Sequence, residues 1–384
     1  MPKNNFWYAV ATLVGGTVGV GIFGIPFVFV KAGFLPGILF LVGLTAVVML
    51  LNAMYGEVIL RTSTKHQMLG YVQKYLGSGA RDILLLTFVL SVYGAMLSYI
   101  IISGTFLSNF FSFFSYSSPA FFSTLFFIVG ATLLLMGVRR VSKFDLLMLG
   151  FFVILIFSVA VLSIRHIDIH NYALLTKEFW FLPFGVIFFA LSGMVALPLA
   201  REVLDIAPDG QGMTSGRKFK KVIMVGTAIP AILCLVFVLA VVGVSGDATS
   251  PEAVSGLAFF LGERIVLIGS LFGILSITTS FLGMGLALSE SFQYDFKFSK
   301  LRAWLLVVVP PYFLFLLGLR NFIDVMKLVG GLALSVEGIF LLFLYMQARK
   351  KGDRIPEYSV RVAQPVIYLL MAVFAFAAIY TLVT

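Results

Sequence analysis

Charge and cysteine are scarce in this 384-residue chain. Asp, Glu, Lys and Arg make up 11% of its residues, whereas soluble domains hold about 25%. The single cysteine, Cys234, allows no intrachain disulfide. The three histidines lie outside the apolar runs, so a metal centre or a cysteine nucleophile with a histidine base within a membrane is not expected. These absences argue against a soluble domain, a disulfide-stabilised fold and an enzyme.

Long apolar runs occupy most of the chain. Hydrophobic residues make up 60% of it, and the mean hydropathy is +1.07. A bilayer core about 30 Å thick needs roughly 20 apolar residues per helix. The sequence therefore predicts an all-α integral membrane protein with eleven transmembrane helices and one membrane domain covering 1–384. The predicted spans are 6–30, 36–60, 81–109, 119–137, 143–164, 179–205, 220–244, 264–291, 302–319, 323–346 and 363–383.

The net charge of +10 is distributed unevenly between the loops. With the N-terminus placed in the cytoplasm, 21 of the 27 Lys and Arg residues fall in cytoplasmic segments. This asymmetry is what the positive-inside rule requires. We therefore expect a multi-pass plasma-membrane protein with a cytoplasmic N-terminus and an external C-terminus, and no nucleic-acid partner.

The stretch GGTVGVGIFGIPF, Gly15–Phe27, interrupts the first span with five glycines and a proline. Non-helical backbone survives at membrane depth only where it lines a cavity or is buried in protein. Pro26 and the glycines favour unwinding between Thr17 and Gly21. Close packing of helices through small residues remains an alternative. A dinucleotide site is not expected, because no strand precedes the glycines and Pro26 follows them almost at once.

A second copy of this feature supports the cavity. Gly193 precedes Pro198 by five residues, as Gly21 precedes Pro26, and the two glycines lie 172 residues apart. Five spans separate the two helices, so the second copy is inverted relative to the first. Paired interrupted helices in two inverted halves point to a transporter binding site. The predicted organisation is a first repeat at 6–164, an inverted repeat at 179–346 and an extra helix at 363–383.

Helix ends at such breaks have a defined chemistry. The N-terminus of a half-helix offers free N–H groups and a positive dipole end to an anion. The C-terminus of a half-helix offers free carbonyls to a cation. Two such breaks at the midplane suit a zwitterion, so an α-amino acid is the expected substrate.

Several motifs resemble those of the amino acid/auxin permeases, a family of the amino acid–polyamine–organocation superfamily. Gly19–Pro26 is similar to the first-helix signature of that family. The likeness covers the whole chain and is strongest to bacterial permeases for hydroxy, aromatic or neutral amino acids. It implies a LeuT-type fold, with a 5+5 inverted repeat, broken helices 1 and 6, and an eleventh helix. The other motifs are Gly70–Gly77, Gly137–Arg140, Ala196–Pro198 and Thr279–Gly283.

The resemblance also implies a substrate site. Amides around Val20 and Gly21 would hold the substrate carboxylate. Tyr93 and Tyr99 are candidates for the pocket wall, although ordinary packing tyrosines are an equal alternative. The carbonyls expected near the ammonium belong to Thr17, Phe189, Ala190 and Ser192.

Two coupling ions remain open. In sodium-coupled relatives, the place of SITTSF (276–281) supplies hydroxyls to a sodium ion. Hydroxyls of this kind also bond back to their own helix, and this chain has Gly15 where sodium-coupled animal relatives have asparagine. The candidate sodium ligands are Gly15, Val18, Ser276, Thr279 and Ser280.

For a proton, the candidate is Glu337, close to the middle of its span, where an ionisable group is costly and usually functional. A buried scaffold role is the alternative for Glu337. Glu202 is expected at the cytoplasmic interface, and Glu57 in a structural pair with Arg61.

The expected function is ion-coupled import of neutral or aromatic amino acids by alternating access. An exchanger or a nutrient sensor with the same fold remains an alternative. No enzyme activity and no cofactor other than sodium or a proton are expected, and the protein is expected to be monomeric within the lipid bilayer.

Overall fold

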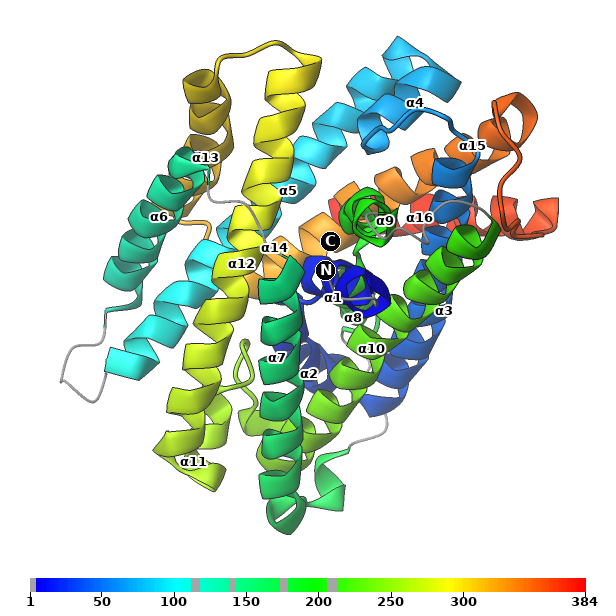
Figure 1. Cartoon of the computed structure of the whole chain (residues 1–384). Coiled ribbons are helices and arrows are strands. Elements are labelled where there is room, and N and C mark those ends of the chain that lie inside the picture. The colour runs from blue at the N-terminus through cyan, green and yellow to red at the C-terminus, as the bar shows by residue number, and fades with distance from the viewer. Residues whose placement is uncertain (1–4, 112–117, 138–141, 173–178, 206–212) are drawn as a thin grey trace.

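A computed structural model describes residues 5–111, 118–137, 142–172, 179–205 and 213–384. Within these ranges every regular element is helical, and α1, α8 and α9 lie near the centre of the molecule (Figure 1). The helices of the first half are α1 (Asn5–Thr17), α2 (Gly21–Ala32), α3 (Phe34–Leu60), α4 (Met68–Leu76), α5 (Ser78–Phe111), α6 (Pro119–Met136) and α7 (Ser142–Ser163). Those of the second half are α8 (Leu182–Leu191), α9 (Leu197–Asp205), α10 (Met213–Ser245), α11 (Ala258–Leu261), α12 (Glu263–Asp295), α13 (Lys300–Leu316), α14 (Phe322–Leu328), α15 (Leu334–Lys351) and α16 (Gln364–Val383).

The helix boundaries follow the apolar runs. Each predicted span coincides with one helix or one interrupted pair to within a few residues. In the described ranges, nine helices are long and apolar enough to cross a membrane, and the bent pair α1 and α2 makes a tenth. The one remaining predicted span, 302–319, corresponds to α13, which has 17 residues. The multi-pass membrane fold is confirmed, and the count of eleven remains a prediction.

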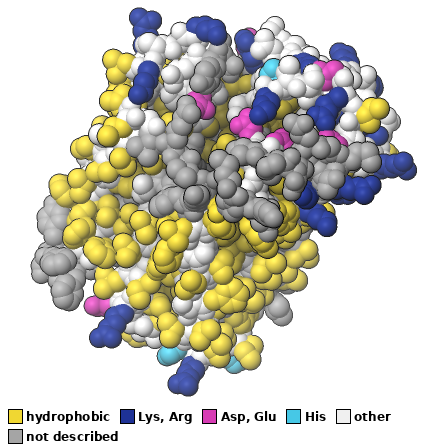
Figure 2. All heavy atoms as spheres, in the orientation of Figure 1, with side chains coloured by type: hydrophobic (Ala, Val, Ile, Leu, Met, Phe, Trp, Pro, Cys, Tyr) yellow, Lys and Arg dark blue, Asp and Glu magenta, His cyan; other side chains and the backbone are white. Residues whose placement is uncertain are grey.

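Charged side chains gather at one end of the molecule. Figure 2 shows Lys and Arg concentrated at the end that carries α4, with a broad hydrophobic belt below it. Large apolar side chains such as Leu39, Leu86 and Ile154 are exposed, as expected for a surface that faces lipid. The three-dimensional charge distribution therefore agrees with the asymmetry read from the loops.

The connection between α15 and α16, residues 352–363, lies at this charged end and is held there by hydrogen bonds to buried and surface side chains. Glu57 of α3 is fully buried, and both of its carboxylate oxygens are occupied. Arg61 Nε lies 2.7 Å from Oε1, Ser359 donates to the same oxygen, and the Val360 N–H donates to Oε2 at 2.6 Å. Glu57 is therefore a structural residue, as the sequence indicates.

Asp353 makes the second attachment of this connection. Its carboxylate accepts hydrogen bonds from Lys74 of α4 and from the Ser63 hydroxyl and N–H. The Lys74 bond, followed by those from Ser63, holds the pKa of Asp353 well below its usual range. The 352–363 segment thus ties the ends of α3 and α4 together.

Candidate functional site

The first helix break separates α1 from α2. Residues 18–20 are not helical, and the two helix axes differ by 53°. Val20 is the N-cap of α2, and no side chain caps this end. The Phe23 N–H donates to the Val20 carbonyl at 3.1 Å, whereas the N–H groups of Gly21 and Ile22 lack both an intrahelical acceptor and a side-chain cap. The break predicted between Thr17 and Gly21 is confirmed.

The second break follows α8. Ser192 and Gly193 are not helical, and a short 3₁₀ turn, Met194–Ala196, leads into α9. The last carbonyls of an α-helix have no intrahelical donor. Here the Phe189 carbonyl accepts only a long bond, 3.4 Å, from the Ser192 N–H. The end of α8 is therefore a carbonyl-rich site for a positive group.

The two breaks face each other at closest packing distance. A Cβ atom added to Gly21 would lie 2.6 Å from the Ala190 Cα atom. One added to Gly193 would overlap the Thr17 hydroxyl. Real Cβ contacts are longer than this, so these positions require glycine. The glycines therefore serve both interpretations of the sequence, because they permit unwinding and allow the two half-helices to touch.

A small cavity of about 40 Å³ lies beside the paired breaks. We call it the central cavity. Its volume is that of one or two water molecules. Its lining comes from both breaks and from α5, α12 and the π-helical turn and start of α15. The lining residues are Gly16, Thr17, Gly19, Gly21, Phe88, Ser91, Val92, Ala95, Tyr99, Phe189, Ser192, Val195, Met284, Val329, Leu334 and Glu337.

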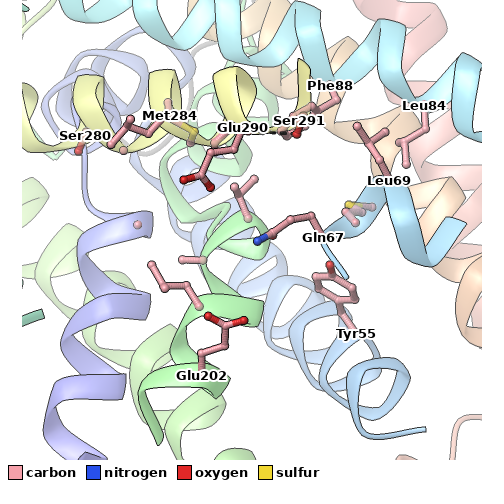
Figure 3. A pocket seen from close by; sticks show the side chains of 18 of the residues that line it. Tyr55, Gln67, Leu69, Leu84, Phe88, Glu202, Ser280, Met284, Glu290 and Ser291 are labelled. Carbon is pink, nitrogen blue, oxygen red and sulfur yellow. Dashed lines mark hydrogen bonds between the residues drawn. The ribbon is translucent and has the colours of Figure 1, made fainter. Parts of the chain in front are cut away.

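A larger cavity of about 450 Å³, which we call the vestibule, adjoins the central cavity. The two share Gly16, Phe88, Tyr99, Val195 and Met284 in their walls. In Figure 3, Gln67, Glu202 and Glu290 surround this space from three different elements. Because α4 and the C-terminal ends of α9 and α12 lie at the Lys- and Arg-rich end, the vestibule opens there.

Aromatic packing closes the opposite side of the breaks. Phe23 of α2 contacts Phe106 of α5 and Phe237 of α10, with ring centroids 5.0 and 6.0 Å apart. All three side chains are buried. The two ends of the site are therefore unlike, because one adjoins an open vestibule and the other a packed aromatic cluster.

The structure brings together most of the residues predicted for the substrate. Thr17, Gly21, Phe189, Ser192 and Tyr99 all line the central cavity. Val20 and Ala190 lie beside it, as the cap of α2 and the residue against Gly21. Tyr93 lies elsewhere: its hydroxyl donates to the Leu306 carbonyl of α13.

Of the predicted sodium ligands, Ser280 of α12 lies against the first helix break. A Cβ atom added to Gly19 would lie 3.3 Å from the Ser280 hydroxyl oxygen. That oxygen is buried without a hydrogen-bond partner among the described residues. Thr279 bonds back to the Ser276 carbonyl at 2.8 Å. Buried hydroxyls are usually paired, so the orphaned Ser280 oxygen fits a cation ligand. The other two predicted ligands, Gly15 and Val18, lie at the end of α1.

Glu337 lies in the wall of the central cavity and is 2% exposed. Ser91 of α5 donates a hydrogen bond of 2.6 Å to Oε1. The residue follows a π-helical turn, Val329–Ala333, and such turns are frequent at functional sites. Sequence reasoning selected Glu337 but missed Ser91, since a serine within a long apolar helix carries no signal of its own partner.

The fold and the paired breaks are of the LeuT type. The crystal structure of MhsT in complex with L-phenylalanine is similar, with a TM-score of 0.63 and 13% identity, covering 100% of this chain and 98% of that chain. The closed structure of Mhp1, a nucleobase-cation-symport-1 family transporter with bromovinylhydantoin bound, gives a TM-score of 0.66 at 10% identity, covering 98% of this chain and 90% of that chain.

The chain belongs to the tryptophan/tyrosine permease family, whose model matches residues 2–381. A curated relative, glutamine transporter 2 of Aliivibrio fischeri, is 20% identical over 350 residues, or 88% of each chain. The resemblance to amino acid permeases is therefore confirmed. Family and fold make the protein a secondary amino acid transporter and not an enzyme.

Proposed function

We propose that the protein imports neutral or aromatic amino acids by coupling them to an inward flow of sodium or protons. The observation that carries this proposal is the meeting of two helix breaks at one cavity. The uncapped start of α2 supplies amides for a carboxylate, and the end of α8 supplies carbonyls for an ammonium. The family name, the glutamine-transporting relative and the phenylalanine-bound structural neighbour support an amino acid of this class.

The direction of opening supports an inward-facing state. With the Lys- and Arg-rich end in the cytoplasm, the vestibule would release substrate inward while the Phe23–Phe106 contact closes the outside. Rocking of the broken helices against α5 and α12 would expose the central cavity to the other side. One positive charge moving through 100 mV supplies about 2.3 kcal/mol, enough for roughly fiftyfold accumulation.

Each coupling ion has one supporting observation. The orphaned Ser280 oxygen beside Gly19 supports sodium, held by Thr279, Ser280 and backbone oxygens of α1 and α12. The buried carboxyl of Glu337 in the central cavity supports a proton. The experiment that tests the function is uptake of labelled amino acids into proteoliposomes, under a sodium gradient at equal pH or a proton gradient without sodium. Failure of both gradients to drive accumulation would favour an exchanger or a sensor instead.

If sodium is the coupling ion, Thr279→Ala and Ser280→Ala are each expected to raise the sodium concentration for half-maximal uptake by about tenfold, since each removes one oxygen ligand. The measurement is initial uptake rate against sodium concentration. Thr278→Ala is the matched control, because Thr278 makes the same kind of bond back to its helix, to Ile274, and is not a predicted ligand. An unchanged sodium dependence in both site variants would contradict the proposed sodium site. Glu337 would then be the remaining candidate for the coupling residue.

A further inference from the structure

Glu57 and Glu337, which are 0% and 2% exposed, differ in how their carboxyl groups are hydrogen-bonded. Glu57 has hydrogen bonds on both carboxylate oxygens and a partner in Arg61. Glu337 has one bond, from Ser91 to Oε1. Among the described residues, Oε2 of Glu337 has no hydrogen-bond partner and the carboxyl has no ion-pair partner. Because Glu337 lines the central cavity, its carboxyl is open to a partner that the chain does not supply.

The open oxygen belongs to the cavity that holds the helix breaks. Glu337 and Ser91 line the central cavity together with Gly21 and Ser192. An amino acid whose carboxylate and ammonium groups bind at the two helix breaks would therefore share this cavity with the Glu337 carboxyl. The ligand and the Glu337 carboxyl can therefore make contact within the central cavity itself.

The remaining wall mixes apolar side chains with the hydroxyl-bearing side chains of Thr17, Tyr99 and Ser192. It contains no charged side chain other than Glu337 among the described residues that line it. A substrate side chain in this space would meet hydrocarbon, neutral hydroxyls and one carboxyl group, that of Glu337. The apolar residues contributed by α5, α12 and the 329–337 region are Phe88, Val92, Ala95, Met284, Val329 and Leu334.

We propose that Glu337, positioned by Ser91, accepts a hydrogen bond from the side chain of the transported amino acid. The site would then prefer amino acids whose side chains carry an N–H or O–H donor over apolar ones of the same size. This inference rests on the proposed function and deepens it, because it assigns a specificity role to one cavity residue. The role holds for both protonation states, since an ionised carboxylate and a neutral acid each offer an acceptor oxygen.

The test compares binding of two matched pairs to the purified protein: tyrosine against phenylalanine, and tryptophan against 1-methyltryptophan, which lacks the indole N–H. We expect wild type to prefer the donor-bearing member by ten- to a hundredfold, the range for a hydrogen bond to a charged group. In Glu337→Leu the preference should fall to about one. Glu337→Gln should keep much of it, because the amide oxygen still accepts.

Two further variants test whether the preference depends on the Glu337 carboxyl and on its position. Asp324→Asn, at an exposed acid on α14, should leave the preference unchanged. Ser91→Ala should reduce it, since the carboxyl loses the donor that positions it. A wild-type preference near one, or a full preference in Glu337→Leu, would overturn the inference while leaving the proposed function intact. Absence of amino acid binding by wild type would contradict the proposed function instead.

Discussion

Gly21→Leu is expected to abolish amino acid binding in a protein that still folds. The Cβ atom alone would lie 2.6 Å from the Ala190 Cα atom and 2.8 Å from its Cβ atom. Backbone cannot yield as a side chain can, so α2 must move away from α8. The larger side chain would also fill the central cavity. Both effects remove the amides and carbonyls from the positions that the substrate requires.

The measurement is equilibrium binding in detergent, with thermal unfolding recorded for each variant. Gly21→Ala, which adds only the clashing atom, should weaken binding less than leucine does. Gly43→Leu is the matched control, since Gly43 lies on an exposed face of α3 with nothing within 4 Å of an added Cβ. If Gly21→Leu bound amino acids with wild-type affinity, the proposal that the first helix break forms part of the substrate site would be wrong.

Glu57→Ala is expected to lower stability by about 3–5 kcal/mol, the cost of removing one partner from a buried, hydrogen-bonded ion pair. The variant leaves Arg61 without its partner and leaves the Val360 N–H and the Ser359 hydroxyl without an acceptor. The 352–363 segment would then lose one of its attachments to α3, while the Tyr358 hydroxyl would still donate to the Ala53 carbonyl. Thermal unfolding, combined with protease sensitivity of this segment, measures both effects.

Asp82→Ala is the control for charge removal alone. Asp82 is paired with Arg81 at the surface, and such pairs contribute at most about 1 kcal/mol. A Glu57→Ala variant as stable as Asp82→Ala would contradict the structural role of Glu57.

The sequence predicted the spans and the breaks because both depend on local chemistry. A run of about 20 apolar residues has few alternatives in lipid. Glycine followed by proline at the same interval in two spans predicted both interruptions. Thr17 and Gly21, chosen from this pattern, line the central cavity together with Ser192. These residues lie at the breaks themselves, so their place depends little on how the helices pack.

Residues on intact helices were harder to place. Tyr93 and Tyr99 are six positions apart on α5, which turns about 100° per residue, so they point in different directions. The structure directs Tyr99 to the cavity and Tyr93 to α13. A helix that is apolar on every side does not reveal which face meets its neighbours.

The partnership of Ser91 and Glu337 could not be predicted for a related reason. The two residues are 246 positions apart, and their contact depends on how α5 packs against α15. The π-helical turn at Val329–Ala333 also shifts the facing of the residues after it. Neither the packing nor the turn has a signature in the sequence.

The most direct test of the account is whether binding requires both charged groups of an amino acid. The measurement compares the affinity of the purified protein for one amino acid, for its carboxamide and for the corresponding acid without the amino group. If the breaks at Gly21 and Ser192 bind the two ends of a zwitterion, each derivative should bind at least about tenfold more weakly, the loss expected from one charge-assisted hydrogen bond. Equal affinity for the amino acid and either derivative would contradict the account.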